Sequence, residues 1–224
     1  MSVVIFGDSI TNRASDETGG GWTSRLWSLI FHDFHTVYAP GVKDSNHSVL
    51  ELGIGGDTIV GVSKRFESEL RTRIEIAEHG IVSDVVVGLA VGVNDSRVNG
   101  ITQLPEVPLD LFEETYSAVL ARLKEIGVDV FTVGLTPCDD SKMSPCLFSQ
   151  DNDDYTIERI KRYDAAVQKC AAIAGVSFVE VFPAFNKIIA DEGLDALLAD
   201  GLHPNDRGHE LIAELVFAEI RSKL

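Results

Sequence analysis

Short apolar runs of strand length alternate with segments of helical periodicity along the whole chain, and this alternation constrains the fold more than any other feature. The apolar runs predict strands at 2–6, 36–39, 81–91, 128–135 and 176–182. Apolar residues recur at helical spacing within 22–30, 58–77, 109–126, 157–174 and 206–220. Strands that alternate with helices form a parallel sheet covered by helices on its faces. The sequence therefore predicts an α/β fold, and we expect Asp206 to cap the last helix.

Composition and charge narrow the class of protein further. The chain has 224 residues, of which 45% are hydrophobic, so it can bury a sizeable core. It shows no internal repeat and no linker-like tract, which predicts one domain over residues 1–224. Lys and Arg number 19 against 35 Asp and Glu, a net charge of −16, and this field repels phosphate backbones and anionic membranes. We therefore expect no nucleic-acid partner, and the lack of a run of about 18 apolar residues predicts no membrane-spanning segment.

The cysteines indicate the redox compartment. The chain has three cysteines, an odd number, at Cys138, Cys146 and Cys170, and no two of them form a C-x-x-C pair. This favours reduced thiols over a zinc ribbon or a disulfide scaffold. A disulfide between Cys138 and Cys146 stays open, because both flank one loop-like stretch. No basic segment of a signal peptide precedes the first apolar run. We expect a cytoplasmic protein.

One long stretch, from Cys138 to Tyr155, lacks both periodicities and is polar and acidic. A loop of this length in a compact domain is usually functional or mobile. The alternative is a solvated, variable insertion. In either case we expect the stretch to bury little surface.

Polar residues with catalytic potential follow the predicted strands. Ser9 comes just after the first strand, Asn94 follows the third, and Asp200 and His203 precede the last helix. In parallel sheets, ligands bind outside the carboxyl ends of the strands. Acyl transfer needs a nucleophile, a base, a carboxylate that orients the base, and a donor for the oxyanion. The sequence provides all four residue types at one predicted edge.

Each of these residues also has a structural explanation when it is taken alone. Ser9 could cap a helix, Asn94 could close a turn, and Asp200 and His203 could cap the last helix. Their joint placement at strand ends is what favours catalysis.

Four sequence blocks resemble those of the SGNH hydrolases, also called GDSL esterases and lipases. The first block contains Gly7-Asp8-Ser9-Ile10, with Ile10 where the family name has Leu. The other blocks are Gly55-Gly56-Asp57-Thr58, Gly92-Val93-Asn94-Asp95, and Asp200-x-x-His203-Pro204-Asn205. All four occur in the family's order between residues 3 and 205, so the resemblance covers nearly the whole chain.

The resemblance implies a role for each site residue. Ser9 is implied as the nucleophile, His203 as the general base, and Asp200 as the residue that orients His203. The implied oxyanion hole consists of the Ser9 amide, the Gly56 amide and the Asn94 side chain.

Two finer assignments accompany these roles. Gly56 is preferred to Gly55 because it directly precedes the Asp-Thr pair, and a glycine lets the backbone N–H approach a ligand without a Cβ in the way. Asp8, Asp57 and Asp95 are interpreted as braces for the loops rather than as reacting groups.

The resemblance also implies a fold and a reaction. The fold is a three-layer α/β/α sandwich with a five-stranded parallel sheet, which is flavodoxin-like. The reaction is hydrolysis of a small-molecule carboxylic ester through an acyl-enzyme on Ser9, without metal or organic cofactor. Short-chain esters, acetylated carbohydrates, lysophospholipids and acyl thioesters are all consistent with it, because loops such as 19–22 and 138–155 decide specificity.

Other interpretations fit the sequence less well. An α/β-hydrolase needs a G-x-S-x-G elbow deep in the chain, and Thr11 stands where the second glycine belongs. Residues 49–56 look like a glycine-rich nucleotide loop, but Asp57-Thr58 breaks the pattern. His203 and His209 lie near two aspartates, but their spacing points them to different sides of a helix, which disfavours a metal site.

A non-catalytic binding module with the same fold is the alternative from a different functional class. It would hold an acylated sugar or lipid without cleaving it. Loss of Ser9, His203 or Asp200 would mark such a module, and all three residues are present.

Overall fold

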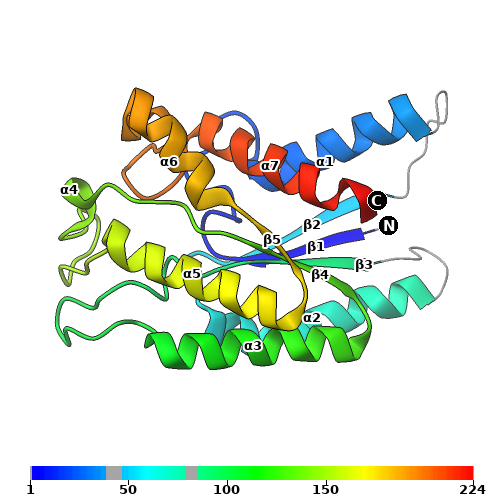
Figure 1. Ribbon diagram of the computed structural model, residues 1–224, viewed down its shortest axis with the longest axis horizontal. Helices are drawn as coiled ribbons and strands as arrows, with labels where there is room; N and C mark the ends of the chain where they lie inside the picture. The colour runs from blue at the N-terminus through cyan, green and yellow to red at the C-terminus, as the bar shows by residue number, and fades with distance from the viewer. Residues whose placement is uncertain (1, 39–46, 79–84, 224) are drawn as a thin grey trace.

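Five parallel strands form one sheet in the computed structural model, which describes residues 2–38, 47–78 and 85–223. The strand order is β2-β1-β3-β4-β5 (Figure 1). The strands are β1 (Ser2–Gly7), β2 (Ser48–Gly53), β3 (Val85–Ala90), β4 (Asp129–Val133) and β5 (Ser177–Val179). The predicted α/β fold with a five-stranded parallel sheet is confirmed.

Helices cover both faces of the sheet and complete the predicted three-layer sandwich (Figure 1). The layer drawn above the sheet contains α1 (Gly21–Asp33), α6 (Val181–Glu192) and α7 (Asp206–Ile220). The layer drawn below contains α2 (Ile59–Glu78), α3 (Leu109–Ile126) and α5 (Ile157–Ala174). Shorter elements are η1 (Phe34–Tyr38), α4 (Asp140–Met143), η2 (Leu194–Ala196) and η3 (Arg221–Lys223). None of the helices in the described part of the chain is long and apolar enough to cross a bilayer.

The core lies where the helix layers meet the central strands. Every residue of β1 is buried, because helices cover both faces of a parallel sheet and its central strands must be apolar on both sides. On one face, the Phe6 ring meets the Phe66 ring of α2 edge to face. On the other face, α1 and α7 pack against each other, and Trp22 and Ile220 are buried there.

Local chemistry sets the helix ends. Thr156 accepts a hydrogen bond from the Arg159 amide at the start of α5, and Gly175 ends that helix in the left-handed conformation. Asn205, rather than Asp206, caps α7, because its side chain accepts from the Gly208 amide. The prediction that Asp206 is the cap was one residue off.

Two strand predictions were wrong in position. Residues 36–38 belong to the π-helix η1 that continues α1, and residue 39 lies outside the described residues. The second strand is instead β2, within the stretch that looked like a nucleotide loop. It is an edge strand whose six residues are all only half-buried, so it lacks the continuous apolar run that marks a central strand. The predicted strand 176–182 ends early, because Val181 and Phe182 begin α6.

The segment 138–155 is part of the core, contrary to the expectation that it buries little. Cys138, Met143, Cys146 and Tyr155 are all buried in the main hydrophobic cluster. Backbone hydrogen bonds tie the segment to itself, including Cys146 N to Asp153 O at 2.7 Å and Tyr155 N to Met143 O at 2.9 Å. Cys138, Cys146 and Cys170 are free thiols, so Cys138 and Cys146 are not joined. The expectation was wrong because the mostly polar composition of the segment gave no sign that a few of its apolar side chains are buried.

Replacing Met143 with alanine should lower the free energy of unfolding by about 2–5 kcal/mol, the range for truncating a fully buried side chain. Met143 is 0% exposed, whereas Leu147 in the same segment is 75% exposed. Leu147→Ala is therefore the matched control and should change stability by less than about 0.5 kcal/mol. Urea unfolding followed by tryptophan fluorescence measures both. If both variants lose the same small amount of unfolding free energy, the segment is not part of the core.

Candidate active site

The register of β1 with β2 and β3 brings three loops to one level at the carboxyl edge of the sheet. Gly7 at the end of β1 lies opposite Gly53 of β2 and Ala90 of β3. A Cβ on Gly7 would lie 2.1 Å from Thr11 Oγ1 and 2.7 Å from the Ala90 carbonyl oxygen. Only glycine lets the chain turn this tightly. The turn places Ser9 two residues beyond the sheet.

The loop that carries Ser9 is held by its own backbone and by Asp8. The buried Asp8 carboxylate accepts the Ile10 amide at 2.9 Å. The Asn12 amide donates to the Asp8 carbonyl and the Ala14 amide to the Ser9 carbonyl, both at 2.9 Å. Burial raises the pKa of Asp8 to about 6, although the Ile10 amide and nearby His203 act in the opposite direction. Asp8 braces the loop from within, as the sequence interpretation expected.

Ser9, His203 and Asp200 form a continuous hydrogen-bonded chain. Ser9 Oγ lies 3.0 Å from His203 Nε2, and His203 Nδ1 lies 2.6 Å from Asp200 Oδ2. Burial alone would raise the pKa of Asp200. Hydrogen bonds from the His203 ring and from the His203 and Leu202 amides outweigh burial and hold the pKa well below the usual range of an aspartate.

The charge on Asp200 decides the tautomer of the histidine. An ionised carboxylate can only accept hydrogen bonds, so His203 Nδ1 carries the proton and donates it to Asp200. His203 Nε2 is then left with a lone pair that accepts the Ser9 hydroxyl proton. This is the arrangement that activates a serine for attack on a carbonyl.

The loop from Asp200 to His203 is fixed by hydrogen bonds at both ends. Asp200 Oδ1 accepts the Leu202 and His203 amides, each at 2.8 Å. Gly201 has a φ of 99°, which a residue with a side chain rarely adopts. The Asp139 amide donates to the Gly201 carbonyl at 2.7 Å, so the segment 138–155 supports the loop from outside.

A tight turn presents the second block beside Ser9. The Asp57 amide donates to the Ile54 carbonyl at 3.0 Å, and Gly56 has a φ of 78°. Glycine is the residue that takes a positive φ at the third position of a turn. A Cβ on Gly56 would meet nothing within 4 Å, so the backbone conformation, rather than crowding, selects glycine here. Among the described residues, neither the Gly56 nor the Ser9 amide has an acceptor.

The Asn94 amide is fixed on both of its polar atoms. Its Nδ2 donates to the Asp57 carbonyl at 3.1 Å, and its Oδ1 accepts the Tyr155 hydroxyl at 3.1 Å. A carbonyl oxygen only accepts, so this pairing defines which end of the amide carries the hydrogens. One N–H of Nδ2 stays available for a ligand. Asn94 is therefore held by hydrogen bonds to two other segments and is more than a simple turn residue.

Sequence reasoning missed two residues that hold this site together. Tyr155 is buried and orients Asn94, but it ends a stretch that gave no periodic signal. Arg65 is a half-buried residue of α2 whose guanidinium binds the Asp57 carboxylate at 2.9 Å and the Leu52 carbonyl at 2.8 Å. In the sequence it is one of several arginines on a helical segment. No local pattern separates either residue from a surface side chain.

The described residues contain no group of three or more His, Cys, Asp and Glu side chains placed to hold a metal ion. His209, the second histidine considered for such a site, is buried in α7, and its Nε2 donates to the Ala14 carbonyl at 3.0 Å. Burial lowers its pKa. His209 serves to join α7 to the loop that follows Ser9.

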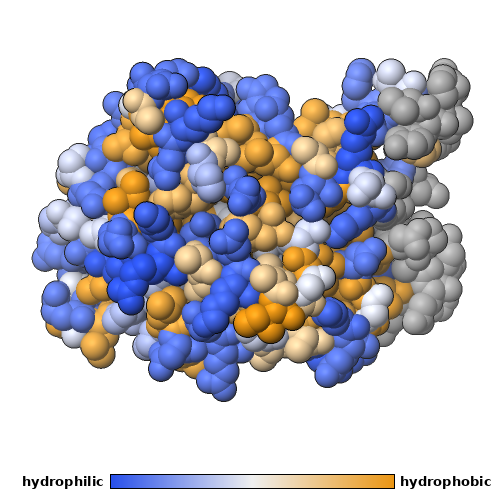
Figure 2. Space-filling view, in the orientation of Figure 1, coloured by the Kyte–Doolittle hydropathy of each residue, from blue (hydrophilic) through white to orange (hydrophobic). Residues whose placement is uncertain are grey.

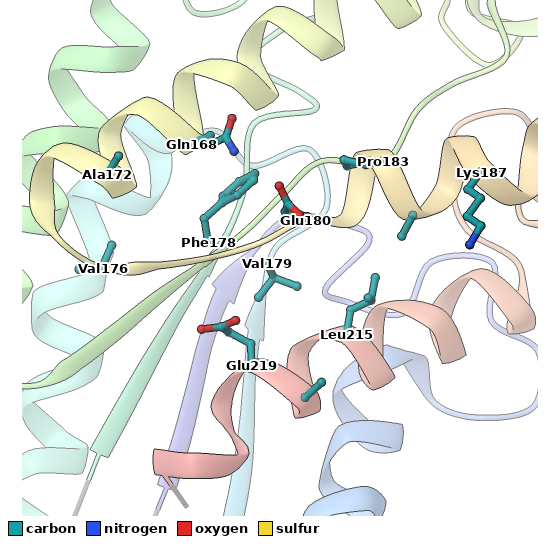
Figure 3. A pocket seen from close by; sticks show the side chains of 12 residues that line it. Gln168, Ala172, Val176, Phe178, Val179, Glu180, Pro183, Lys187, Leu215 and Glu219 are labelled. Atoms are coloured by element: carbon teal, nitrogen blue, oxygen red, sulfur yellow. The ribbon is translucent and has the colours of Figure 1, made fainter.

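A groove of about 790 Å³ lies away from these residues, along β5. Its walls come from α5, β5, α6 and α7 (Figure 3), and Figure 2 shows apolar residues at the centre of this face with polar residues around them. The groove is lined by Phe178, Glu180, Leu215 and Glu219 among others, and no serine, cysteine or histidine of the described chain lines it. Its described lining therefore offers no serine, cysteine or histidine nucleophile.

The GDSL-like lipase/acylhydrolase family model matches residues 5–211. The chain belongs to this family. It is therefore a member of the GDSL/SGNH carboxylic ester hydrolases, as the resemblance implied. The four sequence blocks of this family lie at the carboxyl edge of the sheet, around Ser9.

Similar proteins align with almost the whole length of this chain. The isoamyl acetate-hydrolyzing esterase 1 homolog of Bos taurus is 23% identical over 99% of this chain and 82% of its own length. An acetylxylan esterase from Geobacillus stearothermophilus superposes with a TM-score of 0.71 at 21% identity, covering 98% of this chain and 93% of the other. The acetyl xylan esterase AlAXEase superposes with a TM-score of 0.70 at 22% identity, covering 97% and 98%. Solved structures of the Geobacillus enzyme include catalytic mutants at a serine, a histidine and an aspartate.

Asp95 should make the stability of the fold depend on pH. Its buried carboxylate accepts the Ile59 amide at 2.9 Å and so caps α2, and burial raises its pKa from 3.8 to about 8. Between these values the folded chain binds more protons than the unfolded chain, so this group lowers the free energy of unfolding as pH rises, by up to about 1.4 kcal/mol per pH unit.

The variant Asp95→Asn cannot ionise and should lose this dependence. The wild-type free energy of unfolding minus that of the variant should decline as pH rises from about 4 towards 8. Urea unfolding at several pH values measures the difference. A difference that is independent of pH would mean that Asp95 is ionised in the folded chain over the whole range.

Proposed function

We propose that this protein hydrolyses neutral short-chain esters, and acetyl esters above all, through an acyl-enzyme on Ser9. The hydrogen-bonded chain of Asp200, His203 and Ser9 is the observation that carries the proposal. A binding module has no use for a histidine held between an ionised carboxylate and a serine hydroxyl. The catalytic mutants of the Geobacillus esterase at the same three residue types support the assignment.

In the acylation step, Ser9 Oγ forms a bond to the carbonyl carbon of the ester while its proton moves to His203 Nε2. The carbonyl oxygen takes up the electron pair of the broken π bond. When the tetrahedral intermediate collapses, the bond to the alcohol oxygen breaks, and that oxygen receives the proton from His203 Nε2. Asp200 stabilises the imidazolium that exists between the two transfers.

The oxyanion is stabilised by the amides of Ser9 and Gly56 and by Asn94 Nδ2. These donors are in place before the reaction, so little reorganisation is needed when charge develops. In deacylation, His203 Nε2 takes a proton from water, the water oxygen attacks the acyl carbon, and the proton passes to Ser9 Oγ as the acid leaves. The cycle needs no cofactor.

Two observations favour a neutral acetyl ester as substrate. The similar proteins include a homolog of an isoamyl acetate-hydrolyzing esterase and two acetylxylan esterases. The net charge of −16 also disfavours anionic substrates and anionic surfaces. Acetylated carbohydrates and acetates of small alcohols therefore rank above lysophospholipids. Hydrolysis rates on p-nitrophenyl esters from acetate to octanoate test the preference for acetyl esters. We expect the highest kcat/KM on the acetate.

The variant Ser9→Ala should hydrolyse p-nitrophenyl acetate only at the background rate, because it lacks the nucleophile. A fluorophosphonate probe should label the wild type on Ser9 and should not label this variant. Ser24→Ala on the exposed side of α1 is the control and should retain full activity and labelling. Wild-type rates in Ser9→Ala, or labelling at another residue, would contradict the acyl-enzyme route. A wild type with no turnover of any ester would favour the binding module.

The variant Asn94→Ala should lose kcat by roughly 10²- to 10³-fold, the range for removing one oxyanion-hole donor. The KM should change little, because the ground-state carbonyl gains less from this donor than the transition state does. Steady-state kinetics and a melting curve on one preparation measure both effects.

Asn99→Ala is a matched control, because the Asn99 side chain accepts the Ile101 and Thr102 amides within a turn. This control should lose some stability and keep its kcat. If Asn94→Ala behaves in the same way, Asn94 is only a turn residue and the oxyanion hole lacks a side-chain donor.

A further inference from the structure

An exposed aromatic ring lies against the histidine of the site. The Phe148 and His203 rings are stacked, with centroids 6.0 Å apart and an interplanar angle of 26°. Phe148 is nevertheless 54% exposed, so the imidazole covers only part of its apolar surface. The rest of the ring is open to solvent beside His203.

Phe148 sits on a turn that is tied to the core. The Ser149 amide donates to the Cys146 carbonyl at 3.1 Å, and the Leu147 amide donates to the Lys142 carbonyl at 3.2 Å. The Ser149 hydroxyl accepts the Asp153 amide at 3.0 Å. Cys146 on one side of the turn is buried. The ring is therefore held in place by its backbone, and its exposure is not explained by a loose loop.

The geometry of the reaction determines which part of an ester meets this ring. In the tetrahedral intermediate the acyl carbon carries four groups: Ser9 Oγ, the oxyanion, the acyl chain and the alcohol oxygen. The oxyanion points to Asn94 and its neighbouring amides. The alcohol oxygen must point to His203 Nε2, because that atom supplies the proton that lets it leave. The group attached to the alcohol oxygen is then the part of the substrate next to the histidine ring.

We propose that Phe148 forms the subsite for the alcohol portion of the ester, and that it favours alcohols with a flat apolar face, such as a sugar ring or an aryl group. The inference rests on the proposed function, because it uses the role of His203 as proton donor to the leaving group. A flat group can stack on the free part of the ring and remove it from water. A small alcohol such as ethanol is too short to cover it.

Phe148 should affect the two half-reactions differently. Phe148 contacts the substrate only until the alcohol leaves, so it contributes to acylation and not to deacylation. It also contributes nothing to the choice of acyl chain. A side chain that merely oriented His203 would instead affect every ester and both half-reactions to the same extent.

The test compares Phe148→Ala with the wild type on phenyl acetate, an acetylated xyloside and ethyl acetate. We expect kcat/KM to fall roughly 3- to 10-fold on the first two, the effect of losing one aromatic stacking contact, and less than 2-fold on ethyl acetate. The rate of deacylation, measured after a burst of p-nitrophenol from p-nitrophenyl acetate, should not change. Phe148→Tyr should restore the preference. Ile173→Ala on α5 removes a side chain that is 74% exposed and should leave all three rates unchanged.

Three outcomes would overturn the inference. An equal loss on all three acetates would make Phe148 a support for His203. A loss that depends on acyl chain length, with phenyl acetate compared with phenyl butyrate, would place it on the acyl side. Full wild-type rates in Phe148→Ala would leave it without a role in binding. If the wild type hydrolyses none of these esters, the proposed function itself is wrong. This result differs from the three outcomes above, in which the wild type is active and only the subsite is wrong.

Discussion

The common level at which β1, β2 and β3 end is the constraint on which the site depends. Gly7, Gly53 and Ala90 are in register, so the loops that carry Ser9, Gly56 and Asn94 begin side by side. A slip of one residue in a parallel pair would move one loop by about 3.3 Å, which exceeds the tolerance of a hydrogen bond. Arg65 reinforces this alignment from α2, since its guanidinium binds the carbonyl of Leu52 on β2 and the Asp57 carboxylate in the following loop.

The polar groups near these strand ends come at a cost in stability. Asp8 and Asp95 are buried carboxyls with raised pKa values, and each accepts a backbone amide that would otherwise lack a partner. Asp200 differs, because three hydrogen bonds keep it charged. The site thus contains one carboxylate that is held ionised beside His203, one that stabilises the Ser9 loop and one that caps α2. Natural proteins commonly accept such local costs at functional sites.

The sequence predicted the central elements and singled out Ser9, His203 and Asp200 because both leave local signals, and the catalytic roles of these three residues stay predictions. Helix α5 follows from the periodicity of its apolar residues, and Ser9, Asn94 and His203 follow from blocks of adjacent residues. Strand β2 was misplaced because an edge strand need not be apolar on both faces. The role of Tyr155 was missed because its partner, Asn94, is 61 residues away, and contacts of that kind leave no periodic pattern. The single-domain and cytoplasmic expectations stay predictions.

The sequence separation between Ser9 and His203 has a consequence for synthesis of the protein. Ser9 and His203 are 194 residues apart, and the loop after Ser9 is held in turn by His209 of α7. During translation Ser9 is made 194 residues before His203. A nascent chain that has not yet reached His203 therefore carries Ser9 without its hydrogen-bonded histidine. In the proposed mechanism, ester turnover begins only once both segments have folded together, because Ser9 and His203 are the proton-transfer pair.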